Sequence, residues 1–219
     1  MNFVAHAHVA LRNSRASWDE AFGAVVPDLA SMARTRIERA GLPCAVQEGI
    51  GLHHRADKAF HVLESFQTGA RRIRQVLTDA GLPAGPARAV GHAGFELLLD
   101  GCLLTRGGVR QEFEQMLACA PDIAHAVPPA DADRWRELLR SMRDEKWWLG
   151  YEDPRRVAHA LQRLLQARPR LRFSESAIPI VAAALTAERP ILETVADDII
   201  RSVTEAIQVG RLPSTGERT

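Results

Sequence analysis

The chain of 219 residues predicts an all-α protein that folds as a single helical domain. Its apolar side chains recur about every 3.6 residues, the spacing of one helix face. Stretches rich in Val, Ile and Thr that alternate with period 2, the pattern of a half-buried strand, are scarce. Because 46% of the residues are hydrophobic, the chain can bury one large core. We therefore expect one domain over residues 1–209 and a flexible, polar tail at 210–219.

Glycine and proline clusters divide this pattern into segments, because they permit a positive φ or remove a backbone donor and so end a helix. The main breakers are 41–43, 81–86, 107–108 and 127–129. The segments before the second breaker predict helices over 3–12, 17–26, 43–58 and 60–80. The segments after it predict helices over 86–105, 108–119, 131–145, 154–167, 175–187 and 189–208. Ser17 with Glu20 has the pattern of a capping box, and Asp131 and Asp153 are placed to cap later helices.

The composition argues against nucleic acid or a membrane as a partner. The 28 basic and 27 acidic side chains leave a formal charge of +1, too little to attract a polyanion. No stretch has the apolar length of a membrane span, and the first residues do not resemble a secretory signal. Three widely spaced cysteines argue against a disulfide framework and a structural zinc site. We expect a soluble, cytoplasmic protein.

Histidines are concentrated in the first 92 residues, where six of the eight lie among several acidic residues. Imidazole and carboxylate groups are ligands of divalent transition metals, and both are costly to bury without a partner. A cluster drawn from several helices therefore predicts a metal-dependent hydrolytic centre. The alternative is a scatter of surface and helix-capping histidines. The groups concerned are His6, His8, His53, His54, His61 and His92, with Asp28, Asp57, Glu96 and Asp100.

Two predicted helices carry polar side chains spaced four residues apart, which places them on one helix face. His53 and Asp57 form the first pair, and His92 and Glu96 form the second, with Asp100 one turn further along. Both pairs are candidate metal ligands. The alternatives are a buried imidazole–carboxylate pair for the first and an exposed polar face for the second.

The first helix contributes one candidate ligand. His6 and His8 lie two residues apart, about 200° around a helix, so only one of them can enter a given pocket. We choose His6, and expect His8 to orient a neighbour or to meet solvent. Asp28 follows Pro27 at the end of an apolar stretch, where it can cap the next helix or enter a site.

Several segments together resemble a known family in both order and spacing. They are Asn2-Phe3-x-Ala5-His6-x-His8-x-Ala10, Gly23-x-x-x-x-Asp28, Gly49-Ile50-x-Leu52-His53-x-Arg55-x-Asp57 and Arg71-Arg72. Weaker similarity follows at Trp147-Trp148-Leu149-x-Tyr151 and Ala167-Arg168-Pro169-Arg170-Leu171. This pattern resembles the acyl carrier protein phosphodiesterase (phosphopantetheine hydrolase) family, an all-helical relative of the HD-domain metal-dependent phosphohydrolases.

The resemblance implies a bound divalent metal, with Mn²⁺ as the first choice and Mg²⁺ or Fe²⁺ as alternatives. The ligands it implies are His6, Asp28, His53 and Asp57. The third motif departs from the family, which carries an aspartate followed four residues later by an Asp-His pair. This chain has His92, Glu96 and Leu97 at those places, and we expect His92 and Glu96 to supply the remaining ligands.

The function predicted is a metal-dependent phosphodiesterase that hydrolyses the phosphopantetheine–serine linkage of holo acyl carrier protein, or a related phosphodiester. One alternative is a catalytically altered or silent relative that binds a carrier protein or a phosphorylated ligand. Another is an HD-like phosphohydrolase acting on a nucleotide or small phosphoester. The predicted catalytic residues are Asp57, Arg55 and His54. The predicted substrate-binding residues are Arg71, Arg72 and His8.

Two further features bear on the partner. Arginine supplies almost all the positive charge, which fits a phosphorylated or acidic partner, although genomic base composition produces the same bias. Trp147 and Trp148 cannot share one helix face, so we expect one to pack inward and one to lie at the surface. Core packing is the first interpretation of this aromatic group. A wall for an apolar arm such as pantetheine, or a contact for an acidic helical partner, is the alternative.

Overall fold

The computed structural model describes residues 1–13 and 17–209, so the predicted tail at 210–219 lies outside the described residues. Over these residues the chain forms nine α-helices and no strand, which confirms the all-α prediction. The helices are α1 Phe3–Leu11, α2 Trp18–Met32, α3 Cys44–His61, α4 Glu64–Asp79, α5 Ala84–Leu104, α6 Val109–Cys119, α7 Ala132–Asp144, α8 Pro154–Gln166 and α9 Ile178–Val209. Short 3-10 turns lie at η1 Ala124–Ala126, η2 Pro129–Asp131, η3 Trp147–Glu152 and η4 Glu175–Ala177. No helix in this part of the chain is both long and apolar enough to cross a lipid bilayer.

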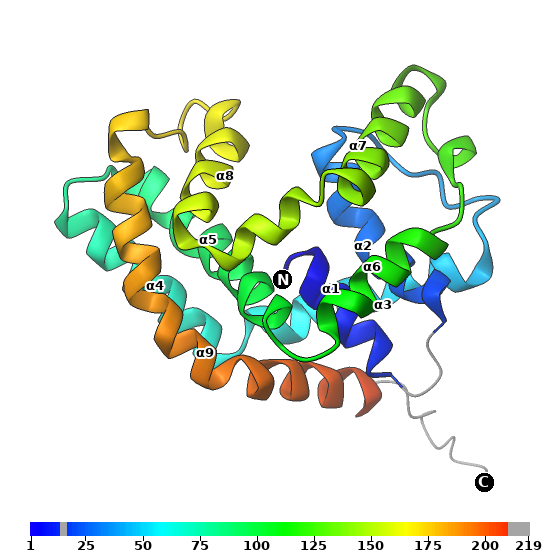
Figure 1. Ribbon diagram of the computed structural model, residues 1–219, viewed down its shortest axis with the longest axis horizontal. Coiled ribbons are helices and arrows are strands. Elements are labelled where there is room, and N and C mark those ends of the chain that lie inside the picture. The colour runs from blue at the N-terminus through cyan, green and yellow to red at the C-terminus, as the bar shows by residue number, and fades with distance from the viewer. Residues whose placement is uncertain (14–16, 210–219) are drawn as a thin grey trace, which may run out of the picture.

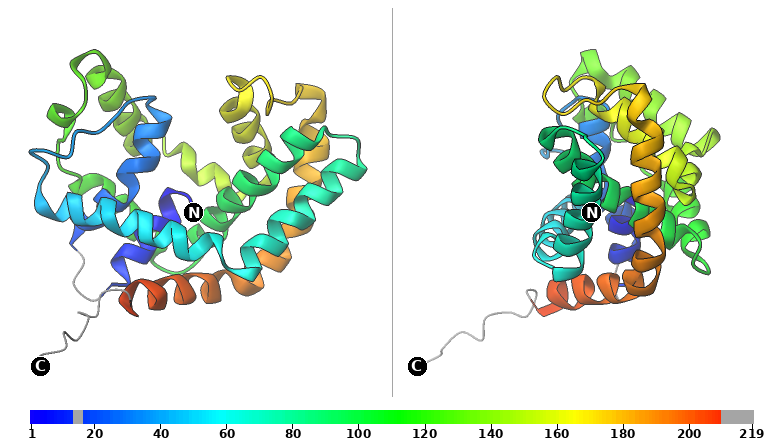
Figure 2. Two further views of the ribbon diagram at one scale, coloured as in Figure 1. Left: turned by 180° about the vertical axis from the view of Figure 1, so that it is seen from behind. Right: turned by 90° about the vertical axis from the view of Figure 1, so that its left-hand side faces the viewer.

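Helix α1 lies at the centre of the molecule. In Figure 1 the start of α1 lies between a group formed by α4, α5, α8 and the first half of α9 and a group formed by α2, α6 and α7. Figure 2 shows α3 and α4 following one another along the side that faces away in Figure 1. Every residue of α1 from Phe3 to Ala10 is buried, because the helix packs against α2, α3, α5, α6 and α9. All nine helices contribute to one contiguous hydrophobic core, as a single domain requires.

Two helices run through prolines at which the sequence predicts an end. Helix α2 continues past Pro27 to Met32, and α9 contains Pro190, so the predicted helices 175–187 and 189–208 are parts of one helix. A proline removes one backbone donor from the helix interior. Buried side chains on both sides of each proline outweigh this loss, and Asp28 consequently lies within a helix.

The predicted helix caps have different outcomes. Ser17 accepts a hydrogen bond from the backbone N–H of Glu20, and Asp153 accepts one from that of Arg155, so both caps are confirmed. The cap predicted at Asp131 is wrong. Its carboxylate accepts hydrogen bonds from the Thr35 hydroxyl and the Arg134 guanidinium, and makes no capping bond to α7.

Glycines allow α2 and α3 to cross with their backbones in contact. A Cβ atom added to Gly49 would lie 2.1 Å from a carbonyl oxygen of α2, and one added to Gly23 would lie 2.3 Å from a carbonyl oxygen of α3. One turn after Gly49, His53 donates its Nδ1–H to the carbonyl oxygen of Ala24 at 2.9 Å. The close crossing therefore sets the position of His53 relative to Asp28, one turn beyond Ala24 on α2.

We expect Gly49→Ala to lower the free energy of unfolding by about 1–3 kcal/mol, because the added methyl group forces the two backbones apart. Gly51→Ala is the matched control on the same helix, since its Cβ would meet only the Arg55 guanidinium, at 3.3 Å. That variant should be as stable as the unsubstituted protein or more so, because alanine favours a helix over glycine. Urea unfolding followed by circular dichroism measures both, and equal stability of the two variants would contradict the prediction.

Candidate metal centre

The buried carboxylate of Asp100 fixes the start of α1. Its Oδ1 accepts a hydrogen bond from the N–H of Ala5 at 2.8 Å, and its Oδ2 accepts from the N–H of Val4 at 3.1 Å and from Asn2 Nδ2 at 2.8 Å. Asp100 thus acts as the N-terminal cap of α1, because Asn2 makes no capping bond of its own. Burial raises the pKa of Asp100 to about 7, although the three donors act in the opposite direction. The cap fixes the position of α1 and therefore that of His6, which lies one turn further along this buried helix.

His6, Asp28 and His53 form a trio of possible metal ligands, called the buried trio below because His6, His53 and the Oδ2 atom of the half-buried Asp28 are buried. One nitrogen or carboxylate oxygen from each lies within 4.8 Å of the others. His6 Nδ1 and Asp28 Oδ2 have no hydrogen-bond partner within the described part of the chain, and the polar contact of His6 Nε2 is with the Asp57 carboxylate, at 3.2 Å. An unsatisfied buried polar atom costs about 1–3 kcal/mol, so such atoms in a group of possible ligands are consistent with a metal site.

The protonation states in the trio suit a metal ion. Burial lowers the pKa of His6 to about 3, so its ring is neutral at neutral pH. The pKa of His53 is also lowered, chiefly by burial, and its Nδ1–H donates to a carbonyl, which leaves the Nε2 lone pair available. Burial raises the pKa of Asp28 well above its ordinary value. A bound divalent cation would balance the charge of the Asp28 carboxylate, and it would accept the lone pairs of the two neutral imidazoles.

Asp57 lies at the edge of the trio. Its Oδ1 is 3.2 Å from His6 Nε2, and its Oδ2 is 3.7 Å from His53 Nε2. The amino nitrogen of Met1 lies 2.8 Å from the same Oδ1. Burial opposes ionisation of Asp57, but the His6 ring and the Met1 amino group overcome it and hold the pKa of Asp57 well below its usual range. The carboxylate is therefore available as a fourth ligand.

A second group forms around Glu96 on α5. Glu96 Oε1 lies 3.1 Å from His61 Nε2 and 3.2 Å from His92 Nε2, and the three residues offer ligand atoms within 4.8 Å of one another. Burial opposes ionisation of Glu96, but the two imidazoles hold its pKa well below its usual range. The Met1 nitrogen lies 3.3 Å from Glu96 Oε1. The six predicted ligands thus fall into two neighbouring groups, because His92 and Glu96 gather with His61 and the other four lie around His6.

His61 was counted in the predicted histidine cluster, but the sequence analysis gave it no role as a ligand. It lies four residues after Asp57, so the spacing that links His53 to Asp57 extends to it along the same face of α3. Continuing that stripe by one turn would have found it.

The predicted catalytic residues on α3 differ in burial. Asp57 is half-buried among the ligands described above, whereas His54 and Arg55 are exposed. The His54 ring lies edge-on to the His53 ring, with centroids 5.3 Å apart. Catalytic roles for these residues stay predictions.

The predicted substrate-binding residues mostly have acidic partners already. Arg72 makes a bidentate ion pair with the buried Glu188 of α9, at 2.6 and 3.0 Å. His8 Nδ1 lies 3.2 Å from Glu112 Oε2 on α6. These contacts give Arg72 and His8 structural roles in joining helices, while Arg71 is exposed. Phosphate binding by the three residues stays a prediction.

A pocket of about 860 Å³ lies beside the two groups, between α8 and the end of α2. Its floor includes Asn2 and Phe3, which directly follow Met1, and Leu97, which follows Glu96. Trp147 lines the pocket, whereas Trp148 is fully buried and donates its Nε1–H to a backbone carbonyl. This confirms the prediction that one of the two tryptophans packs inward and the other does not. Four arginines also line it, and none of the described lining residues is acidic. They are Arg34, Arg156, Arg163 and Arg168.

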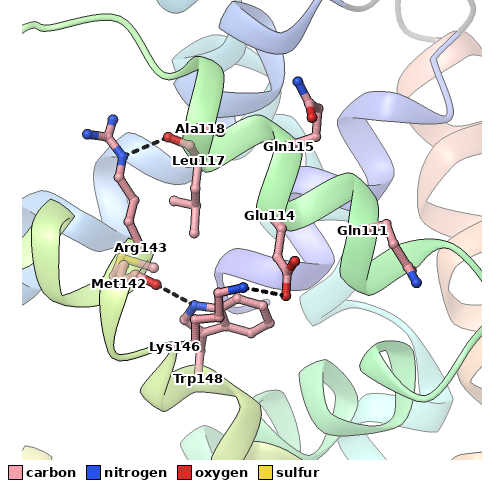
Figure 3. Close-up of a pocket in the computed structure, with 9 residues that line it drawn as sticks. All are labelled: Gln111, Glu114, Gln115, Leu117, Ala118, Met142, Arg143, Lys146 and Trp148. Carbon is pink, nitrogen blue, oxygen red and sulfur yellow. Dashed lines mark hydrogen bonds and ion pairs between the residues drawn. The ribbon is translucent and has the colours of Figure 1, made fainter.

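Another pocket, of about 460 Å³, lies between α6 and α7 (Figure 3). Its charged groups are already paired, since Lys146 Nζ lies 3.2 Å from Glu114 Oε1 and Arg143 donates to the carbonyl oxygen of Leu117 at 2.8 Å. None of the nine residues drawn in Figure 3 is a predicted site residue. The pocket beside the histidines is therefore the better candidate for a substrate.

Comparison of the chain with protein-family models, with curated proteins and with solved structures found no match. The functional conclusion below is therefore drawn from the geometry of the two groups and of the pocket beside them.

We expect Asp100→Ala to lower the free energy of unfolding by at least about 2 kcal/mol, because it leaves buried backbone donors of α1 without an acceptor. Asp100→Asn keeps one acceptor oxygen and should lose less. Urea unfolding measures both losses, and hydrogen exchange at the Val4 and Ala5 amides should be faster in the alanine variant. An alanine variant with unchanged stability and unchanged exchange would show that Asp100 does not cap α1.

Proposed function

We propose that this protein is a metal-dependent phosphodiesterase whose metal ion is bound by the buried trio together with Asp57. The observation that carries the proposal is the convergence of ligand atoms from His6, Asp28 and His53 within 4.8 Å of one another, with Asp28 Oδ2 unpartnered and the Nε2 atoms of both histidines facing Asp57. Two imidazoles and two carboxylates form a mixed nitrogen and oxygen set. Such a set favours Mn²⁺ or Fe²⁺ over Mg²⁺, which prefers oxygen ligands.

The chain's own residues supply the remaining requirements. A bound divalent ion lowers the pKa of a coordinated water and polarises a phosphoryl oxygen. Asp57 stays ionised because its pKa is held low, so it can orient a water molecule by accepting its hydrogen bond. The carbonyl of Ala24 fixes the tautomer and orientation of His53. Arg55, exposed two residues before Asp57, is the residue we expect to bind the phosphate.

The neighbouring pocket supports a substrate that is acidic and carries an extended arm. Its aromatic floor, which includes Phe3, Trp147 and Tyr151, suits an apolar chain, and its four arginines suit carboxylates or phosphates. Holo acyl carrier protein combines an acidic surface with a phosphopantetheine arm, so we propose it as the substrate. A pocket of about 860 Å³ is also within the size range of small-molecule sites, so a nucleotide or small phosphoester is the alternative substrate.

Metal content and hydrolysis test this function together. We expect protein purified without chelator to contain Mn²⁺ or Fe²⁺, and to convert holo carrier protein to the apo form, which the loss of the prosthetic group shows in an intact mass. His53→Ala should lose both the ion of the buried trio and the activity, because it removes a ligand. His125→Ala, a substitution of an exposed histidine in η1, is the control and should keep both.

Two outcomes would overturn the proposal. If no divalent metal binds at any concentration supplied, the buried trio is not a metal site. If metal binds at the trio but neither holo carrier protein nor a simple aryl phosphodiester is hydrolysed, the protein is a binding relative without this activity.

Loss of an arginine that lines the pocket should weaken substrate binding more than it slows the chemical step. We expect Arg156→Ala to raise the KM for holo carrier protein about tenfold, the loss of one charge-assisted contact, with a smaller change in kcat. Arg155 is exposed on the same helix and does not line the pocket, so Arg155→Ala is the matched control. Steady-state kinetics with varied carrier protein measure both, and equal KM values would exclude this pocket as the carrier-binding surface.

A further inference from the structure

We propose that His61, His92 and Glu96 form a second divalent-metal site, next to the buried trio but built from different residues. The proposal stands on the contacts of these three residues, whether or not the buried trio binds a metal ion.

Three ligand atoms converge on one point in this group. The Nε2 atoms of His61 and His92 approach the same carboxylate oxygen of Glu96, at 3.1 and 3.2 Å, and all three atoms lie within 4.8 Å of one another. The two imidazole rings are stacked, with centroids 5.0 Å apart and planes at 20°. The stacking turns both Nε2 atoms toward the carboxylate.

The contacts of His61 orient its ring toward Glu96. His61 donates its Nδ1–H to the carbonyl oxygen of Asp57 at 2.8 Å, and its Nε2 lies at hydrogen-bond distance, 3.1 Å, from Glu96 Oε1. A metal ion among the three ligand atoms would replace the protons between the Nε2 atoms and the carboxylate, since both imidazoles and the carboxylate would then donate electron pairs to the ion.

Aromatic side chains hold the ligands in place from the protein side. Phe66 meets the His61 ring edge-on at 5.0 Å and the His92 ring edge-on at 5.2 Å, and Phe60 also contacts His61. Phe60 and Phe66 are themselves buried. The ring orientations are therefore fixed by packing before any ion binds.

Solvent reaches the group from the other side, because the side chain of His92 is 52% exposed and that of His61 is 33% exposed. Two histidines and one glutamate form the set that holds metal ions with open coordination positions, Zn²⁺ and Fe²⁺ above all. The position is distinct from the buried trio, since the Met1 nitrogen lies between them, close to both Asp57 and Glu96.

Cobalt binding tests this site on the full chain. Co²⁺ is the probe, because its visible absorption reports its ligands, and the protein is first treated with chelator. His92→Ala is the principal variant, since its side chain is half-exposed and its loss leaves no buried cavity. We expect this variant to bind one equivalent of Co²⁺ fewer than the unsubstituted protein, or to bind it at least about tenfold more weakly. In the unsubstituted protein, excess Zn²⁺ should displace the Co²⁺ ion that the His92→Ala variant does not bind.

Further variants keep the test decisive. Glu96→Gln preserves volume and should also lose this equivalent, whereas His125→Ala should lose none. His53→Ala should leave the second site loaded, which separates failure of the second site from failure of the proposed function. The proposal is overturned if both His92→Ala and Glu96→Gln bind as much Co²⁺ as the unsubstituted protein, with the same affinity and the same spectrum.

Discussion

The capping of α1 by Asp100 is the interaction that positions His6, and with it the buried trio. A helix buried along its whole length leaves its first N–H groups without water, so an acceptor must come from another part of the protein. Asp100 supplies it from α5, and thereby fixes how far α1 extends into the centre. His6, one turn along, then reaches the α2–α3 crossing, and Met1 lies between Asp57 and Glu96.

Two polar stripes meet around this capped helix. On α3 the stripe consists of His53, Asp57 and His61, and on α5 of His92, Glu96 and Asp100, each with a spacing of four residues. One end of the α3 stripe lies with His6 and Asp28, and its other end lies with Glu96. The last member of the α5 stripe faces backbone donors instead of a ligand position. The same spacing therefore places candidate metal ligands at some turns and a helix cap at another, depending on what lies opposite.

The sequence predicted what depends on local pattern. Helical spacing and breakers predicted a helical segment at the place of each described helix, with α9 divided into two, and the pairs His53–Asp57 and His92–Glu96 were found because residues four apart share a face. The prolines of α2 and α9 misled the prediction, because burial of the flanking side chains outweighs one lost hydrogen bond. A local pattern also cannot show which residues far apart in the chain contact one another. The bidentate contact of Arg72 with Glu188 is one case, because it depends on how α4 packs against α9.

Leu97 stands at the place where this chain departs from the third motif of the family that its sequence resembles. Leu97 is buried and lines the pocket, so an apolar side chain stands where the resemblance implies an imidazole. Imidazoles nevertheless reach the same carboxylate, one from the preceding turn of α5 at His92 and one from α3 at His61. A metal ion responds to which atoms converge on it, whatever their order in the chain. The imidazoles beside Glu96 therefore come from two helices, and a motif that follows a single helix contains only one of them.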